Sequence, residues 1–303
     1  MNMYVKSINI GVLNIVLGCF AFLSFLQLSA QRDIIIDADT GNEVDDFYAL
    51  ARILLEPTVN ITALNAAHWQ TSHWAIENTM ENSHRLNQQL LGEMGLSLKT
   101  NRGAMARMYD WGDRAQHSAA AYEIIKQAKA NENVTILVLG ALTNVASAVY
   151  IEPAIAEKIE VFWLGTTMDF EKGVLKRDDF NPLMDPYALD YLLNSKVVMN
   201  IMPVSVAVKM EIGFDTLNNK IGSHFLGKFL MNRWTTHLDG SRKSRVLWDL
   251  ALITAFIHPE LATAKQIMTS KDSGNREIMF YTQIDADAIY EDFYKTLLAF
   301  EKE

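Results

Sequence analysis

Five acidic side chains fall within ten consecutive positions near residue 40. Asp37, Asp39, Glu43, Asp45 and Asp46 lie in the segment IIIDADTGNEVDD, directly after an apolar run and before an apolar-periodic stretch. One or two acids could cap a helix N-terminus and interact with its dipole. Five like charges this close repel one another unless a cation lies among them. Because Ca²⁺ and Mg²⁺ take carboxylate oxygens as ligands, the segment predicts a divalent metal site.

The elements that must position these acids are strands alternating with helices. Apolar, β-rich runs predict strands at 33–37, 59–64, 134–140, 159–165 and 197–204. Helical patterns lie near 45–55, 72–91, 115–130, 141–150 and 185–194. This alternation predicts an α/β fold, with an open, mostly parallel, Rossmann-like sheet covered by helices on both faces. Ligands of such sheets bind beyond the carboxyl ends of the strands, where the acidic segment falls.

The first thirty residues differ from the rest of the chain. Lys6 is their only charged side chain, an apolar stretch covers 8–28, and the small-residue sequence LSA precedes Gln31. These features predict a signal peptide at 1–30 and a secreted or periplasmic protein without stable membrane association. An uncleaved anchor and a lipid anchor at Cys19 are the alternatives. Residues 31–303 are expected to form a single domain.

The cysteine count and the net charge exclude several classes of function. Cys19 is the only cysteine, so a chain that starts at Gln31 has no disulfide, thiolate catalysis or cysteine-ligated metal. The sequence carries 27 basic and 36 acidic residues, and loss of Lys6 would leave a net charge of −10. That charge argues against nucleic acid as the main partner.

Five segments, in order along 33–259, resemble the motifs of the nucleoside hydrolase family. DADTGNEVDD (37–46) resembles its opening D-x-D-P-G-x-D-D, with Thr for Pro and two extra residues, and some secreted bacterial members carry a D-x-D-x-x-N-E-x-D-D form. ALN (63–65) and VTILVLGALTNVASAV (134–149) resemble the next two motifs. DFNPLMDPYAL (179–189) and LWDLALI (247–253) resemble the last two.

The resemblance implies Ca²⁺-dependent hydrolysis of the N-glycosidic bond of ribonucleosides, which gives ribose and free base. It implies that Asp39, Asp46 and Asp249 are metal ligands, together with the backbone carbonyl of Leu139. Asp46 would also be the general base that takes a proton from a metal-bound water. Carboxylates and a divalent ion suit a reaction that passes through an oxocarbenium-like sugar. A small-molecule ribonucleoside is therefore the expected partner, and a homo-oligomer is left open.

Other residues match family positions around the sugar. Asp45 and Asn181 match ribose-hydroxyl ligands, and Asn65 matches a further ribose-side residue. Asp179 stands where the family has a longer Glu that contacts the sugar. Asp37 matches an acid that supports the metal ligands.

Trp248 precedes Asp249 where many members carry a His that protonates the leaving base. Purine-preferring members also carry Trp here and stack the base on it, so the resemblance implies purine preference. The alternative is a core aromatic on an apolar helix face. His68 and His73 are alternative leaving-group acids, and Glu43, an insertion in the opening motif, could be an added ligand or lie outside the site.

Two other functions stay open from the sequence. Asp37 and Asp39 also fit the D-x-D-x-T/V motif of haloacid-dehalogenase-like phosphatases, with Asp37 as nucleophile, although Gly41 replaces the expected Thr or Val. A non-catalytic protein of the same fold that binds sugar and metal is the second alternative. It is suggested by the shortened Asp179 and by Gly173, near which the family has a ribose-contacting Asn.

Overall fold

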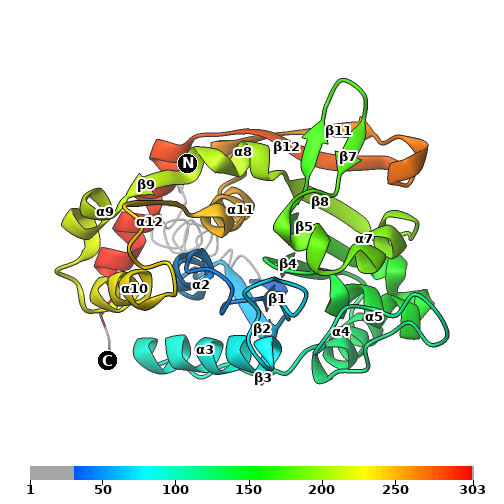
Figure 1. The fold of residues 1–303 in the computed structure, drawn as a ribbon, viewed down its shortest axis with the longest axis horizontal. Coiled ribbons are helices and arrows are strands. Elements are labelled where there is room, and N and C mark those ends of the chain that lie inside the picture. The colour runs from blue at the N-terminus through cyan, green and yellow to red at the C-terminus, as the bar shows by residue number, and fades with distance from the viewer. Residues whose placement is uncertain (1–30, 302–303) are drawn as a thin grey trace, which may run out of the picture.

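The computed structural model describes residues 31–301, whose centre is an eight-stranded sheet in the order β11-β12-β8-β5-β4-β1-β2-β3 (Figure 1). Its strands are β1 (Arg32–Ala38), β2 (Val59–Ala66), β3 (Thr100–Asn101), β4 (Val134–Val138), β5 (Ile159–Leu164), β8 (Val198–Met202), β11 (Ala262–Met268) and β12 (Glu277–Ile284). All neighbouring pairs are parallel except β11 and β12. The predicted α/β fold with a mostly parallel sheet is confirmed.

Helices cover both faces of the sheet, as Figure 1 shows. Those of the described residues are α2 (Asp45–Leu54), α3 (Thr79–Met94), α4 (Ala119–Ala130), α5 (Thr143–Ile151), α6 (Phe180–Met184), α7 (Pro186–Leu193), α8 (Val204–Ala207), α9 (Phe214–Ile221), α10 (Phe225–Thr236), α11 (Trp248–Ile257) and α12 (Ala286–Ala299). Two small antiparallel sheets pair β6 (Thr167–Asp169) with β7 (Val174–Lys176), and β9 (Glu211–Gly213) with β10 (Ser244–Val246). Within residues 31–301, no helix combines the length and apolarity needed to cross a bilayer.

The apolar run of β1 is explained by burial on both of its faces. Ile34 and Ile36 point into the core beneath α2 and α11, whereas Ile35 packs into the opposite core beneath α4 and α5. Side chains alternate along a strand, so a strand covered on both faces needs apolar residues at every position. The acidic segment starts at Asp37, the last residue but one of β1, and continues past the carboxyl end of the strand.

The five predicted strands are present, but several boundaries differ. The strand predicted at 134–140 ends at Val138, and the helix predicted at 72–91 covers Thr79–Met94. Residues 72–78 form turns instead, and Asn78 adopts a left-handed conformation with φ 59°. The helix predicted from 115 begins at Ala119 with Ser118 as its cap.

Some elements were not predicted, among them β3, β11, β12, α9 and α10. Residues 262–268 are largely exposed and carry no apolar run, so this antiparallel edge strand lacks the pattern of a buried strand.

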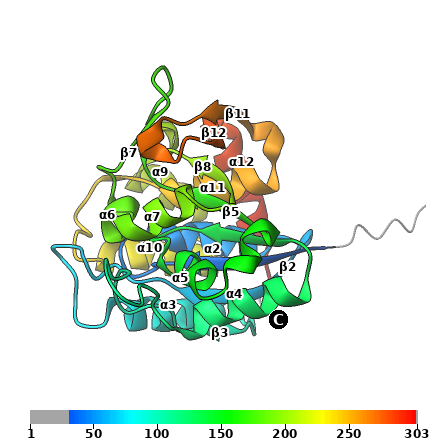
Figure 2. The same ribbon diagram turned by 90° about the vertical axis from the view of Figure 1, so that its right-hand side faces the viewer.

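The predicted signal peptide at 1–30 lies outside the described residues. Figure 2 shows the loop after β2 and the short helix α6 on the same side of the molecule, beyond the carboxyl ends of the strands.

Candidate functional site

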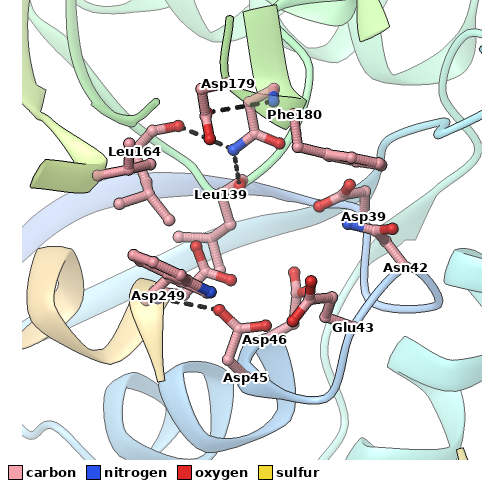
Figure 3. A pocket seen from close by; sticks show the side chains of 13 residues that line it. Asp39, Asn42, Glu43, Asp45, Asp46, Leu139, Leu164, Asp179, Phe180 and Asp249 are labelled. Atoms are coloured by element: carbon pink, nitrogen blue, oxygen red, sulfur yellow. Dashed lines mark hydrogen bonds between the residues drawn. The ribbon is translucent and has the colours of Figure 1, made fainter. Parts of the chain in front are cut away.

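Three carboxylates from two helices converge at this edge of the sheet (Figure 3). Asp45 and Asp46 form the first turn of α2, and Asp249 lies in the first turn of α11. One oxygen from each lies within 4.8 Å of the others, and all three residues are buried. The backbone N–H of Asp249 donates to Asp45 Oδ2 at 3.2 Å, so Asp45 caps α11 from another helix. The two first turns are therefore joined directly.

Several carboxylate oxygens in this cluster have no protein partner. Asp39 Oδ2, Asp46 Oδ1 and Asp249 Oδ1 are buried and accept no hydrogen bond from any described residue. A buried carboxylate without a partner is costly, and a hard cation would supply the missing interaction. The donor set therefore fits a divalent metal ion.

The electrostatics of the cluster lead to the same conclusion. Burial raises the pKa of Asp46 well above its usual value, and the charges of Asp39 and Asp45 raise it further. Burial likewise raises the pKa of Asp249, with added repulsion from Asp45 and Asp46. The pKa of Asp39 is raised by burial and by Asp45. A cation among these groups would favour their ionised forms instead.

The carboxylates open onto a pocket at the carboxyl edge of the sheet (Figure 3). Residues singled out from the sequence line much of it, namely Asp39, Asp45, Asp46, Leu139, Asp179, Asn181, Trp248 and Asp249. The other lining residues are Asn42, Glu43, Leu164, Phe180 and Val204. Sequence reasoning left Glu43 open and missed the other four. Leu164 ends β5 and Val204 closely follows β8, so their positions at strand ends were the available signal.

Gly140 allows Asp39 to approach the end of β4. A Cβ at residue 140 would lie 2.6 Å from Asp39 Oδ1, which is too close for any side chain. This is a physical reason for glycine directly after Leu139, in the segment that borders the pocket.

Asn181 is held by the ends of two strands. Its Nδ2 donates to the carbonyl oxygens of Leu139 at 2.7 Å and Leu164 at 2.8 Å. Both amide hydrogens are thereby used, which leaves Oδ1 as the atom that could meet a ligand. Asp179 caps α6, because its Oδ2 accepts from the backbone N–H groups of Asn181 and Thr166, each at 3.3 Å. Burial raises the pKa of Asp179, and these backbone bonds oppose the rise.

Asp37 and Asn65 lie beneath the pocket and do not line it. Both are fully buried. Asn144 Nδ2 lies 3.2 Å and 3.0 Å from the two carboxylate oxygens of Asp37, and Asn65 Oδ1 accepts from Asn101 Nδ2 at 2.9 Å. Burial raises the pKa of Asp37 to about 7, against the effect of Asn144. A carboxylate in this position cannot reach a substrate as a nucleophile, which argues against the phosphatase alternative.

The histidines after β2 lie outside this pocket. His68 is fully buried, its Nε2 lies 2.9 Å from Thr143 Oγ1, and burial lowers its pKa to about 4. His73 lines a neighbouring cavity with Trp74 and His237, and this cavity shares Asn42 and Glu43 with the main pocket. Neither histidine therefore lines the carboxylate pocket.

Trp248 contacts both the core and the pocket, and its role in stacking a base stays a prediction. It is half-buried, packs against the core beneath α2 and α11, and also lines the pocket. Across the site, Trp74 stacks on Phe180 with ring centroids 5.3 Å apart and planes 20° apart. The pocket thus has aromatic rings beside its carboxylates.

A parallel α/β sheet with a buried, convergent carboxylate cluster at its carboxyl edge defines an enzyme fold with a candidate metal centre. The family model for inosine-uridine preferring nucleoside hydrolases matches residues 34–291, and the chain belongs to this family.

Individual relatives agree with this assignment. A probable uridine nucleosidase 1 from Oryza sativa subsp. japonica is 25% identical over 264 residues, covering 78% of this chain and 80% of the relative. Among solved structures, the plant nucleoside hydrolase PpNRh1 is similar with a TM-score of 0.69 and 17% identity, over 88% of this chain and 99% of that one. A purine-preferring ribonucleoside hydrolase from Gardnerella vaginalis gives a TM-score of 0.66 at 17% identity, over 88% and 98%.

Proposed function

We propose that this enzyme hydrolyses the N-glycosidic bond of ribonucleosides, that it requires Ca²⁺ and that it prefers purine nucleosides. One observation carries the proposal: buried carboxylate oxygens of Asp39, Asp46 and Asp249 lack partners among the described residues, and all three residues line a pocket. Membership of the nucleoside hydrolase family supports the reaction class.

The cation would be held by Asp39, Asp46 and Asp249, with the carbonyl oxygen of Leu139 as a neutral ligand. Asp45 lies in the same cluster, but one of its oxygens already accepts from the Asp249 N–H. Only oxygen atoms are offered, which favours a hard ion such as Ca²⁺ over softer transition metals. When bound, the ion supplies a fixed positive charge that orients ribose hydroxyls and makes a nearby water more acidic.

The chain's own residues then act on the sugar. Asp46 accepts the proton of the attacking water, and the surrounding carboxylates stabilise the positive charge that develops on the ribose ring. Asp45 and the Oδ1 of Asn181 bind ribose hydroxyls. Asp179, which lines the pocket while capping α6, borders the sugar. Asn65 and Asp37 support these groups from below rather than by direct contact.

The purine preference rests on Trp248. A half-buried indole at the rim of the pocket offers a flat apolar face to a leaving base, and a two-ring base covers more of it than a one-ring base. The relatives include a probable uridine nucleosidase and a purine-preferring hydrolase, so the test compares both kinds of base.

The test is ribose release from inosine, guanosine, adenosine and uridine, with added Ca²⁺ and with a chelator. We expect release that stops in chelator, returns with Ca²⁺ and is faster for the purine nucleosides. Equal rates in chelator would overturn the metal requirement. No release from any nucleoside, with ribose still bound, would favour the non-catalytic sugar-binding alternative.

We also infer export of the protein, from the charge and apolar pattern of residues 1–30. N-terminal sequencing of the protein isolated from its native cells should begin at Gln31. A chain that retains its first thirty residues and fractionates with membranes would contradict this inference.

A further inference from the structure

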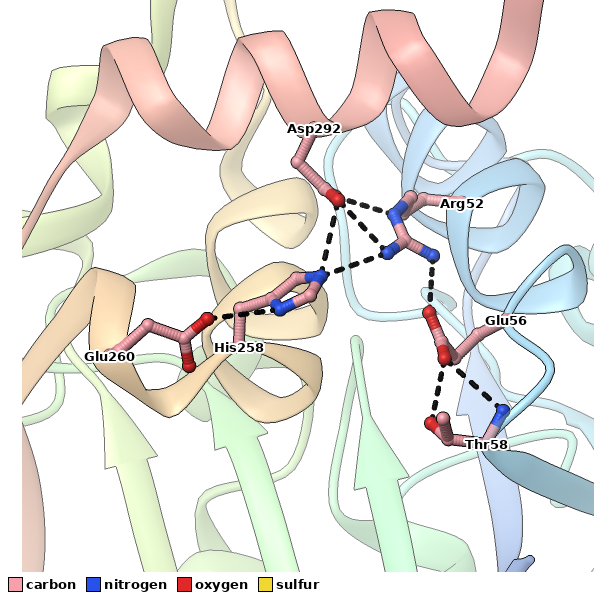
Figure 4. Close-up of polar contacts among 6 residues, drawn as sticks. All are labelled: Arg52, Glu56, Thr58, His258, Glu260 and Asp292. Atoms are coloured by element: carbon pink, nitrogen blue, oxygen red, sulfur yellow. Dashed lines mark hydrogen bonds and ion pairs between the residues drawn. The ribbon is translucent and has the colours of Figure 1, made fainter. Parts of the chain in front are cut away.

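The far ends of helices α2 and α11 meet around one buried guanidinium. Arg52 lies in the last turn of α2, and only 3% of its side chain is exposed (Figure 4). Its Nε and Nη2 donate to the two carboxylate oxygens of Asp292 at 2.6 Å and 3.2 Å. Its Nη1 donates to Glu56 at 2.9 Å, and its Nη2 lies 3.3 Å from His258 Nε2. A planar guanidinium bound in this way fixes the orientation of its partners.

The partners of Arg52 belong to different helices. His258 follows the last residue of α11, and its backbone N–H donates to Thr254 in that helix at 2.7 Å. Asp292 lies in α12, and its Oδ1 is 3.2 Å from His258 Nε2. Arg52 therefore joins the C-terminal ends of α2 and α11 to a common carboxylate.

The opposite ends of the same two helices carry the metal-site carboxylates. Asp46 is six residues before Arg52, or roughly 9 Å along the helix axis. Arg52 is thus too far from the pocket to touch a substrate. Between the two ends, the helices contact each other through buried apolar side chains, and apolar burial is non-directional. Directional contacts exist at both ends: the Asp45–Asp249 bond at one, and the Arg52 cluster at the other.

We propose that Arg52 is a positioning residue for the carboxylate site. It holds α2 and α11 in one axial register, so that the oxygens of Asp46 and Asp249 converge although the unpaired charges repel. The proposal rests on the proposed function in one respect only, namely that the converging carboxylates bind a divalent cation.

The test compares Arg52→Met with Arg52→Lys in the otherwise unaltered protein. Met keeps an apolar stem and removes every donor, whereas Lys restores the charge without the planar fork. By calorimetry we expect Arg52→Met to weaken Ca²⁺ binding by about tenfold or more, the scale for partners that orient metal ligands. Arg52→Lys should recover part of the loss. Asp292→Asn, which keeps the shape of its side chain, serves as a milder second variant if Arg52→Met does not fold.

Arg276→Met is the matched control. This guanidinium is half-buried and donates to the carbonyl oxygens of Ser195 and Val197, which belong to neither α2 nor α11. It should lower Tm in chelator while leaving Ca²⁺ affinity unchanged. Arg52→Met with unchanged Ca²⁺ affinity and lowered Tm would show a purely structural role and overturn the proposal.

Amide hydrogen exchange without metal separates this proposal from the proposed function. Loss of the Arg52 contacts should speed exchange at the first turns of α2 and α11, including the Asp249 amide, while Arg276→Met should not. If the unaltered protein binds no Ca²⁺, the proposed function fails. Faster exchange in Arg52→Met, but not in Arg276→Met, would still support the positioning role. Unchanged exchange at both first turns would contradict it.

Discussion

Charged side chains are buried around both ends of the helix pair α2 and α11, and the two ends differ in how these charges are partnered. At the C-terminal ends, Arg52 pairs with the carboxylates of Asp292 and Glu56 (Figure 4). At the N-terminal ends, Asp46 and Asp249 each keep a buried oxygen without a partner among the described residues (Figure 3). Breaking a buried pair destabilises a fold, whereas unpaired buried charge is costly from the start. We therefore expect the paired end to hold the two helices in position and the unpaired end to bind a ligand.

The largest expected effect is loss of turnover in Asp46→Asn. Removing the general base should lower kcat by about 100-fold or more, the scale of general-base catalysis. Tm in chelator should stay unchanged or rise, because the substitution removes repulsion from Asp39 and Asp45. Asp33→Asn is the control: Asp33 is exposed at the other end of β1, and both kcat and Tm should be kept. Full activity in Asp46→Asn would contradict the proposed role of Asp46 as general base.

The pH dependence of stability should distinguish the metal-free protein from the Ca²⁺-loaded protein. Burial raises the pKa of Asp37 from 3.8 to about 7, and that of Glu43 from 4.5 to about 7. The unfolded chain therefore loses these protons at lower pH than the folded chain, so the stability that these two groups contribute is present in full below about pH 4 and is lost as pH rises to about 7. Each pKa unit corresponds to about 1.4 kcal/mol.

Thermal unfolding in chelator between pH 4 and 7 measures this slope. Excess Ca²⁺ should reduce the loss of stability with pH, because the cation favours the ionised carboxylates. Asp46→Asn in chelator should show a shallower slope, since one buried carboxyl is gone. Identical slopes with and without Ca²⁺ would mean that the ion does not bind at the carboxylates.

The smallest effect is expected for Trp248→Ala. An aromatic contact contributes roughly 0.5–1.5 kcal/mol beyond its buried area, so the purine-over-uridine ratio of kcat/KM should fall by about tenfold or less. Trp163→Phe controls for a change in core packing, because that indole is fully buried and lies outside the pocket. An unchanged ratio in Trp248→Ala would leave Trp248 as a core residue only.

Parts of the site could be predicted because an apolar run in the sequence marks a buried strand and shows where that strand ends. The apolar run of β1 ends at Ile36, and the acids that begin at Asp37 were predicted to lie at the carboxyl edge of the sheet. Leu139 and Asn181 were placed near the acids by the family resemblance, and the structure brings both to the same pocket. Asp249 was predicted from its motif and from the cost of a carboxylate in an apolar helix.

Other features depend on contacts between distant segments, which no local pattern reveals. Asn65 follows the predicted strand 59–64 as a ligand would, yet it lies inside β2, where its Oδ1 accepts from Asn101 Nδ2 beneath the pocket. Glu43 lies in an inserted loop, and only the packed structure shows that it lines two adjoining cavities. Strand β11 pairs with β12 through its backbone while its side chains stay largely exposed. No motif marks Arg52, and its contacts with Asp292 and His258 arise only from the packing of α12 and of the end of α11.

The most direct test of the account is calorimetric titration of Ca²⁺ into chelator-treated protein, with Asp249→Asn measured beside it. The unpaired oxygens of Asp46 and Asp249 predict saturable binding of a single ion per chain, and loss of that binding in Asp249→Asn. Equal binding in both proteins, or none in the unaltered protein, would contradict the claim that these carboxylates are left unpaired for a cation.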